Sequence, residues 1–323
     1  PLYLLVLKVV HFAASAEYWT EGVIRSVSLV FGLLGIWITY LLARKLISSN
    51  AGLMAAYLLA INPMHVHYSR EARAYTLLIL LIISTIWAVT SFHEYPTKKQ
   101  AVICGVLMSL LAYTHNMAAL ILLPMILWLL LPLYRIEKPS YRDAIVVTAA
   151  TGLVLYLPWV TVLFQQITLA SNPHGSPMQG GVEWVKPIWD FMFPTQLLRS
   201  IAALSHGSPP PFQNLIYVVP LEAVFTAVLS LVLIFLGMLT KVHWRNGNIR
   251  NLMCYLLFAP LILMFLISWL GTPIYIPGRV DTIVLPAYII LLAAGMHALN
   301  GGRHIFRIGT PRHQKDPPHR VRF

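Results

Sequence analysis

Long apolar segments recur along the whole chain, and this pattern limits the available folds more than any other feature. A helix needs roughly 20 residues to cross the hydrocarbon core of a bilayer, and about nine segments reach or approach that length. They lie at 23–47, 51–69, 74–92, 101–113, 117–134, 143–163, 216–240, 251–270 and 282–299. With a mean hydropathy of +0.71, a soluble chain of this size would have to bury nearly every helix on all sides. The sequence therefore predicts an all-α polytopic membrane protein.

Two of these segments, 101–113 and 117–134, are short for a full span. They are expected to form either a helical hairpin or one bent element.

Lys and Arg are distributed unevenly between the loops. Of the 23 Lys and Arg residues, 16 lie in the loops 44–50, 93–100, 133–142 and 241–250 and in the tail after residue 300. These loops alternate with others that carry few positive charges, and the positive-inside rule places them in the cytoplasm. The net charge of +12 is then a topology signal, and no nucleic-acid partner is expected.

Three parts are expected along the chain. Residues 1–22 are a remnant of a first outer loop with an amphipathic helix, and 23–299 form the transmembrane domain, with a long outer loop at 165–213. Residues 300–323 form a basic cytoplasmic tail that anionic membrane lipids would attract. The chain opens on Pro1-Leu2-Tyr3-Leu4, without an initiator Met or a basic n-region, so a fragment lacking its first segment is expected.

A polar stretch at 62–75 interrupts two apolar segments and falls on the predicted outer side. It contains the charged residues Arg70, Glu71 and Arg73. Charges near the membrane are costly and usually face a water-filled cavity or a partner, so this stretch is a candidate functional site.

Three arginines, Arg25, Arg73 and Arg279, are predicted at the outer ends of helices. A guanidinium binds phosphate bidentately and stays charged at any working pH, so an outer cavity holding two or three of them would suit an anionic lipid carrier. The alternative is that these side chains reach lipid headgroups or pair with Glu17, Glu21, Glu71 or Asp281.

The neighbouring side chains admit several roles. Glu71 could be a base, a metal ligand or a partner that orients Arg73, and the last is favoured because a carboxylate beside arginines stays ionised. His65, His67 and His115 could bind a metal, although ordinary hydrogen bonds are favoured, and a divalent metal is left open as a cofactor. Tyr68 and Tyr75 could line a sugar or lipid pocket. The sequence has no Gly-rich phosphate loop, HExxH or GxSxG motif, so no nucleotide-driven reaction is expected.

Several of these stretches resemble one known family. They are RSVSLVFG at 25–32, AGLMAA at 51–56 and NPMHVHYSREARAY at 62–75, followed by YTHN at 113–116, LPW at 157–159, PGR at 277–279 and LP at 285–286. Together they are similar to bacterial GT-C glycosyltransferases related to the dolichyl-phosphate-mannose protein mannosyltransferases. The resemblance spans almost the whole chain and is most specific in the first third. It implies a GT-C-type helical bundle with outer-face loops and interfacial helices.

The resemblance also implies a function. Such enzymes transfer a sugar from a polyprenyl-phosphate carrier to a protein, lipid or glycan acceptor at the outer face of the membrane, here the bacterial plasma membrane, with inversion. Arg73 and Arg279 would then face the carrier phosphate, with Glu71 and Tyr75 nearby, and Arg25 would be structural. The family's catalytic acidic residue would lie upstream of Pro1, which puts activity of this fragment itself in doubt.

Two other functions remain open from the sequence. A transporter or flippase of lipid-linked glycans would also use an outer cavity with arginines, although no inverted repeat is evident. A non-catalytic membrane scaffold is the second alternative.

Overall fold

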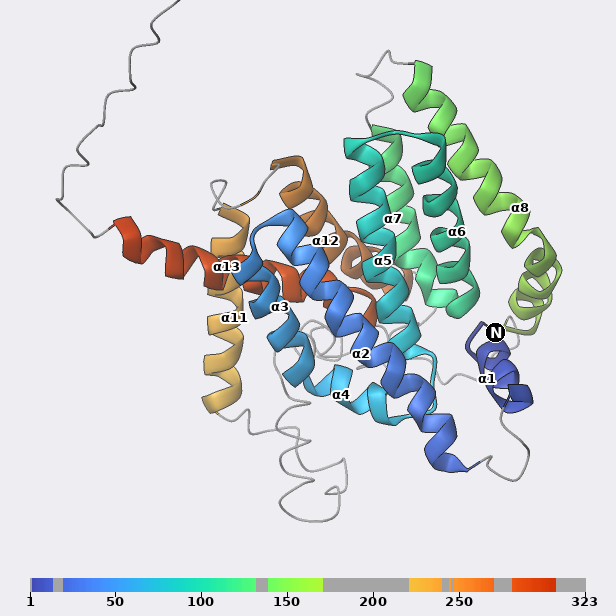
Figure 1. Ribbon diagram of the computed structural model, residues 1–323, viewed down its shortest axis with the longest axis horizontal. Coiled ribbons are helices and arrows are strands. Elements are labelled where there is room, and N and C mark those ends of the chain that lie inside the picture. Colours follow the sequence, from blue (N-terminus) through green and yellow to red (C-terminus); the bar gives the residue numbers. More distant parts are fainter. Residues whose placement is uncertain are drawn as a thin grey trace, which may run out of the picture.

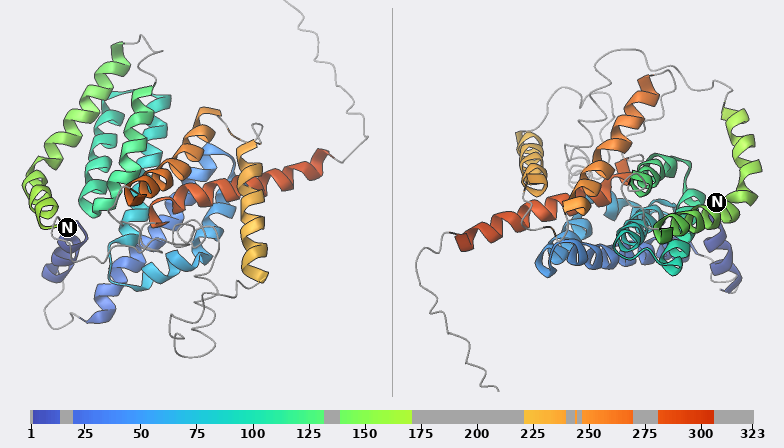
Figure 2. Two further views of the ribbon diagram at one scale, coloured as in Figure 1. Left: turned by 180° about the vertical axis from the view of Figure 1, so that it is seen from behind. Right: turned by 90° about the horizontal axis from the view of Figure 1, so that it is seen from above.

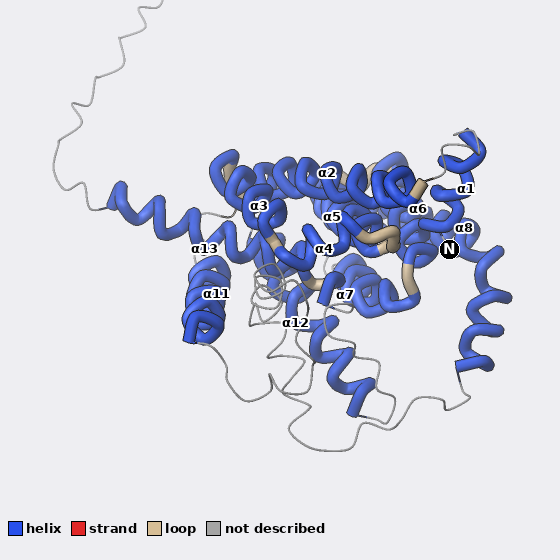
Figure 3. The backbone as a smooth tube through the Cα atoms, turned by 90° about the horizontal axis from the view of Figure 1, so that it is seen from below, coloured by secondary structure: helices blue, strands red, loops and turns tan. Residues whose placement is uncertain are grey.

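The structure is a computed structural model that describes residues 2–13, 20–131, 139–170, 221–239, 244, 247–269 and 281–305. All regular elements in these ranges are helices (Figure 3). In chain order they are α1 Leu2–Ala13, α2 Glu21–Leu46, α3 Ser49–Ile61, α4 Pro63–Arg70, α5 Tyr75–Glu94, α6 Lys98–Thr114, η2 Asn116–Ala118, α7 Ala119–Leu130, α8 Pro139–Ala170, α11 Leu221–Leu239, α12 Gly247–Trp269, η6 Asp281–Ile283 and α13 Leu285–Ile305. The predicted all-α fold is confirmed.

In the part of the chain that the structure describes, four helices are long and apolar enough to cross a membrane. They are Glu21–Leu46, Tyr75–Glu94, Ser140–Val162 and Gly247–Met264. Shorter apolar helices lie in most of the other predicted segments. Two of them, α3 and α7, end earlier than the hydropathy suggested.

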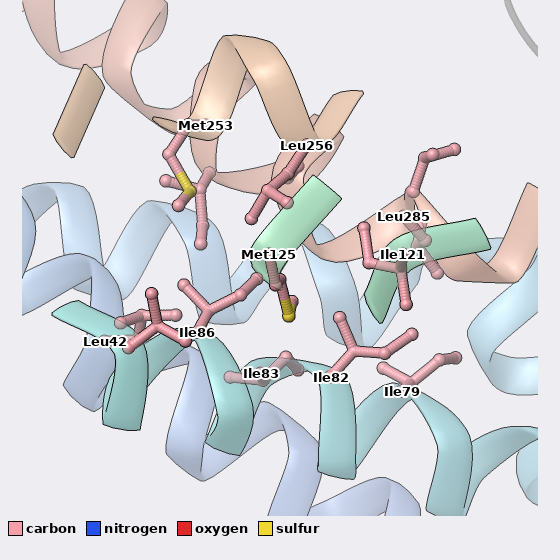
Figure 4. Close-up of a cluster of buried hydrophobic side chains, with 14 of the residues drawn as sticks. Leu42, Ile79, Ile82, Ile83, Ile86, Ile121, Met125, Met253, Leu256 and Leu285 are labelled. Carbon is pink, nitrogen blue, oxygen red and sulfur yellow. The ribbon is translucent and has the colours of Figure 1, made fainter. Parts of the chain in front are cut away.

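Helix α5 is the centre of the bundle. In the most apolar 18-residue stretch of α5, 78% of the residues are buried, against 6% in the corresponding stretch of α8. Its isoleucines meet side chains of α2, α7, α12 and α13 in one continuous apolar core (Figure 4). Helices α8 and α11 lie on opposite flanks of the bundle (Figure 2), which leaves the outward side of α8 for lipid.

The predicted segment 51–69 is two helices rather than one, and the break positions the polar stretch. Asn62 is extended, with φ −64° and ψ 122°, and its Oδ1 accepts a hydrogen bond from the amide of His65 at 3.0 Å. Pro63 disfavours a helical conformation at Asn62 but suits the first turn of a new helix. Helix α3 therefore ends at Ile61, and α4 turns across the end of the bundle (Figure 1).

The short pair of segments proves to be two helices, α6 and α7, so the hairpin alternative is correct. His115 is extended between them, with φ −157° and ψ 139°. The later boundaries also differ from expectation. Helix α8 continues to Ala170 beyond the expected start of the outer loop at 165, and α13 continues to Ile305 into the expected tail.

The helix order places two sets of connections at opposite ends of the bundle. The α2–α3 and α5–α6 connections, which carry the predicted cytoplasmic charges, lie at one end together with the start of α8 (Figure 1). Helix α4 lies at the other end. The described part of the chain thus brings the polar stretch to the end opposite the Lys- and Arg-rich loops.

Candidate functional site

The stretch 62–75 folds as α4, a tight reversal at 71–74 and the first residue of α5. Glu71 is extended, with φ −96° and ψ 142°, and ends α4. The Arg73 amide donates to the Glu71 carbonyl at 2.8 Å, which closes the reversal. As a result the Glu71 and Arg73 side chains extend from the same tight turn.

Helix α4 is fixed against α2 by a close contact at Gly32. A Cβ at this position would collide with Ser69 and lie 3.6 Å from the His65 ring. The Ser69 hydroxyl donates to the His65 carbonyl at 2.8 Å, and His65 Nε2 lies 3.3 Å from the Gly32 carbonyl. The absence of a side chain at Gly32 therefore lets α4 lie directly across α2.

His65 is a structural residue in this contact. It is buried, and burial lowers its pKa to about 4, so the ring is neutral and Nε2–H donates to Gly32. The sequence favoured an ordinary hydrogen-bonding role for His65, and the structure shows such a hydrogen bond to Gly32. Among the described residues, no three His, Cys, Asp or Glu side chains come together as a candidate metal site.

Glu71 lies between His67 and Arg73. Its Oε1 is 3.2 Å from His67 Nε2, and its Oε2 is 3.3 Å from Arg73 Nε. The Glu71 side chain is 32% exposed and that of Arg73 is 51% exposed. Glu71 Oε2 makes no hydrogen bond, so its contact with Arg73 is an ion pair, and half of the Arg73 side chain remains accessible.

Aromatic rings form the layer beside this charged group. The Tyr68 and Tyr75 rings pack against each other, 4.2 Å apart between centroids and tilted by 36°, and both side chains are buried. His67 contacts Tyr68 edge-on at 5.1 Å, and His115 lies 5.7 Å from Tyr75. The His115 Nδ1 accepts the Met117 amide at 3.1 Å, which fixes this ring at the start of η2. The structure therefore brings together His67, Tyr68, Glu71, Arg73, Tyr75 and His115.

Two residues at this site were not anticipated from the sequence. Ser28 of α2 donates to the Arg73 carbonyl at 3.3 Å, and Tyr3 of α1 lies 2.7 Å from the same Ser28 hydroxyl. A serine within an apolar span is a sequence signal of a buried hydrogen bond. Its partner, 45 residues away, could not be read from the sequence.

The other two arginines predicted at outer helix ends, Arg25 and Arg279, differ from Arg73. Arg25 forms an ion pair with Glu21 one turn earlier in α2, which is the pairing alternative. Arg279 lies outside the described residues. The chain is described again from Asp281, where η6 packs against α5, and Leu285 follows near Ile79 and Ile121 in the core (Figure 4).

The helical bundle is similar in fold to membrane glycosyltransferases of the GT-C type. Residues 12–161, which include the whole stretch 62–75, match the dolichyl-phosphate-mannose-protein mannosyltransferase family. This multi-pass membrane family is the one that the sequence motifs resembled. The family recognition is therefore confirmed. No curated protein matches the chain in sequence.

Solved structures share the fold at low sequence identity. The archaeal oligosaccharyltransferase AglB from Archaeoglobus fulgidus, in complex with an inhibitory peptide and a dolichol-phosphate, has a TM-score of 0.57 and 14% identity, over 95% of this chain and 43% of that one. The same organism's oligosaccharyltransferase in complex with Zn and sulfate has a TM-score of 0.59 and 15% identity, over 94% and 41%. ArnT from Cupriavidus metallidurans, bound to undecaprenyl phosphate, has a TM-score of 0.51 and 15% identity, over 87% and 49%. The chain thus spans less than half the length of each of these proteins.

Proposed function

We propose that the protein transfers a sugar from a polyprenyl-phosphate carrier to an acceptor at the outer face of the membrane. Arg73 binds the carrier phosphate, and Glu71 orients Arg73. Tyr68, Tyr75, His67 and His115 line the site next to them.

The observation that carries this proposal is the state of Arg73. Its Nε faces Glu71 and its side chain is half exposed, so the terminal nitrogens are available to a ligand. A guanidinium presents a planar fork of N–H donors that matches two oxygens of a phosphate. Because the ion pair with Glu71 already restricts the Arg73 side chain, less of its freedom is lost when phosphate binds.

The position of the site supports an outer-face reaction. It lies at the end of the bundle opposite the α2–α3 and α5–α6 connections, whose Lys and Arg residues are expected in the cytoplasm (Figure 1). Lipid-linked sugars also offer their phosphate at the membrane surface, where α4 would lie. Proteins of the same fold are described with a dolichol-phosphate and with undecaprenyl phosphate.

The chemistry proposed for the site needs no nucleotide. The acceptor attacks the anomeric carbon, the bond from this carbon to the carrier phosphate breaks, and negative charge develops on the leaving phosphate. A fixed guanidinium stabilises that charge in the transition state. A single displacement inverts the anomeric carbon, and a general base takes the acceptor's proton.

Arg279 is proposed as a second phosphate contact. Arg279 lies two positions before Asp281, the first residue of η6, and η6 packs against α5. The first residue of α5 is Tyr75, which lies in the aromatic layer of the site. This sequence position and the family resemblance support the proposal.

The test is sugar transfer by the full-length protein in proteoliposomes, with a labelled polyprenyl-phosphate sugar as donor. Arg73→Ala is expected to reduce transfer by about 100-fold or more, because one electrostatic contact to the leaving group is lost. Arg25→Ala is the matched control, since Arg25 is equally exposed and paired with a glutamate but lies on α2, outside the reversal at 71–74. Wild-type turnover by Arg73→Ala would overturn the role of Arg73. Movement of the carrier across the bilayer without sugar transfer would instead favour the transporter.

A further inference from the structure

A chain of two hydrogen bonds connects α1 to the backbone of Arg73. The Tyr3 hydroxyl lies 2.7 Å from Ser28 Oγ, and the Ser28 hydroxyl donates to the Arg73 carbonyl at 3.3 Å. These three residues come from α1, α2 and the reversal at 71–74, which are far apart in the sequence. The chain therefore joins three separate elements at one point.

The direction of the hydrogen bonds follows from the donors available. A serine hydroxyl has one proton, and Ser28 gives it to the Arg73 carbonyl. Ser28 Oγ must then accept from Tyr3, so the order is Tyr3 to Ser28 to Arg73. Burial raises the pKa of Tyr3 above its ordinary value of 10.0, which keeps the proton needed for this donation.

Both hydroxyls are shielded from water. Tyr3 is 4% exposed and Ser28 is fully buried. A buried hydroxyl that loses its partner costs more than the hydrogen bond itself contributes, because water cannot replace the partner. The two side chains therefore hold each other, and the Arg73 carbonyl, in one arrangement.

Arg73 is consequently fixed at three atoms. Its amide donates to the Glu71 carbonyl, its carbonyl accepts from Ser28, and its Nε faces the Glu71 carboxylate. Glu71 provides two of these contacts from within the same turn. The contact from Ser28 is the only one of the three that comes from outside the turn, and Tyr3 links it to α1.

We propose that Tyr3, acting through Ser28, is a positioning residue for Arg73 and thereby for the carrier phosphate. The inference rests on the proposed function, since it assigns α1 a part in forming that site. The hydrogen bond from α1 to Ser28 would set the position of the reversal at 71–74, and hence the direction of the guanidinium. Neither residue contacts the carrier.

A double-mutant cycle tests this coupling in the full-length protein. The affinity for undecaprenyl phosphate is measured for wild type, Tyr3→Phe, Arg73→Ala and the double variant. Tyr3→Phe keeps the ring and removes only the hydroxyl, and is expected to weaken binding about fivefold, the equivalent of one hydrogen bond. In the Arg73→Ala background the same change should have no further effect, because Tyr3 acts through Arg73.

Tyr141→Phe is the matched control. Like Tyr3, Tyr141 is a buried tyrosine, and its hydroxyl donates to the Leu129 carbonyl at 3.0 Å. It lies at the start of α8, in the opposite half of the bundle. Its variant should leave carrier affinity unchanged. Hydrogen exchange over residues 71–75 gives a second readout, which should rise in Tyr3→Phe and Ser28→Ala and not in Tyr141→Phe.

Each outcome separates this inference from the proposed function. Normal carrier binding by Arg73→Ala would refute the proposed function and the link to the phosphate with it, while exchange over 71–75 would still report whether Tyr3 holds the turn. If Arg73→Ala binds poorly but Tyr3→Phe binds normally, the function stands and the positioning role is overturned. An equal, additive loss in both backgrounds, or the same loss in Tyr141→Phe, would also overturn it.

Discussion

Replacing Gly32 with alanine should displace α4 from α2 and disturb the site without altering any residue that lines it. The added Cβ would collide with Ser69 Oγ and lie 3.2 Å from Ser69 Cβ. Ser69 could rotate away only by giving up its 2.8 Å hydrogen bond to the His65 carbonyl, worth about 1 kcal/mol. Overpacking adds about 1–3 kcal/mol, and the better helix propensity of alanine returns about 1 kcal/mol. The net expectation is a destabilisation of about 1–3 kcal/mol.

The assay for this change is unfolding in detergent, combined with carrier affinity. Gly22→Ala is the control in the same helix, because a Cβ there meets only Thr20 Oγ1 at 3.6 Å. It should be neutral or stabilising. Adding Ser69→Ala to Gly32→Ala removes the colliding oxygen and should recover part of the loss. If Gly32→Ala is as stable as Gly22→Ala and binds the carrier normally, the contact between α2 and α4 does not position the site.

Three further predictions concern the same end of the bundle. Glu71→Gln should weaken carrier binding several-fold in a lipid-binding assay, because Arg73 loses its ionic partner; tighter binding would mean that Glu71 mainly repels the phosphate. Asn62→Ala should lower the free energy of unfolding by about 1 kcal/mol, since it removes the cap of α4, whereas an unchanged midpoint would show that packing alone ends α3. The pKa of His65 in the folded protein, about 4, lies below its unfolded value of 6.5, so its contribution to stability is complete above pH 6.5 and is lost as the pH falls towards 4. That loss, up to about 3 kcal/mol, should appear in unfolding titrations of the wild type and be absent in His65→Gln.

The sequence predicted the helical class and singled out the polar stretch at 62–75, because both depend on local patterns. The apolar segments are long enough to be recognised individually, and the charges of 70–73 stand out against them. The break at Asn62 and Pro63 was also encoded locally, although the hydropathy of 51–69 conceals it. Here the preference of proline for a helix start outweighed the continuous apolar run.

The remaining features depend on contacts between distant parts of the chain. The close approach of Gly32 to Ser69 and the link from Tyr3 through Ser28 to Arg73 join residues far apart in sequence. A single sequence does not show which serine donates a hydrogen bond to which carbonyl. The contacts between the rings of Tyr68, Tyr75 and His115 also could not be predicted from the sequence. They require α4, α5 and the α6–α7 connection to meet at one end of the bundle.

The central claim is that Arg73 binds the phosphate of a polyprenyl carrier, and ligand-induced stabilisation tests it most directly. The unfolding midpoint of the full-length protein is measured with undecaprenyl phosphate and with undecaprenol, which lacks the phosphate. A ligand that binds only the folded state raises the midpoint with its concentration. Undecaprenyl phosphate should stabilise wild type and Arg25→Ala well above undecaprenol, and this difference should vanish in Arg73→Ala. An undiminished difference in Arg73→Ala would contradict the claim.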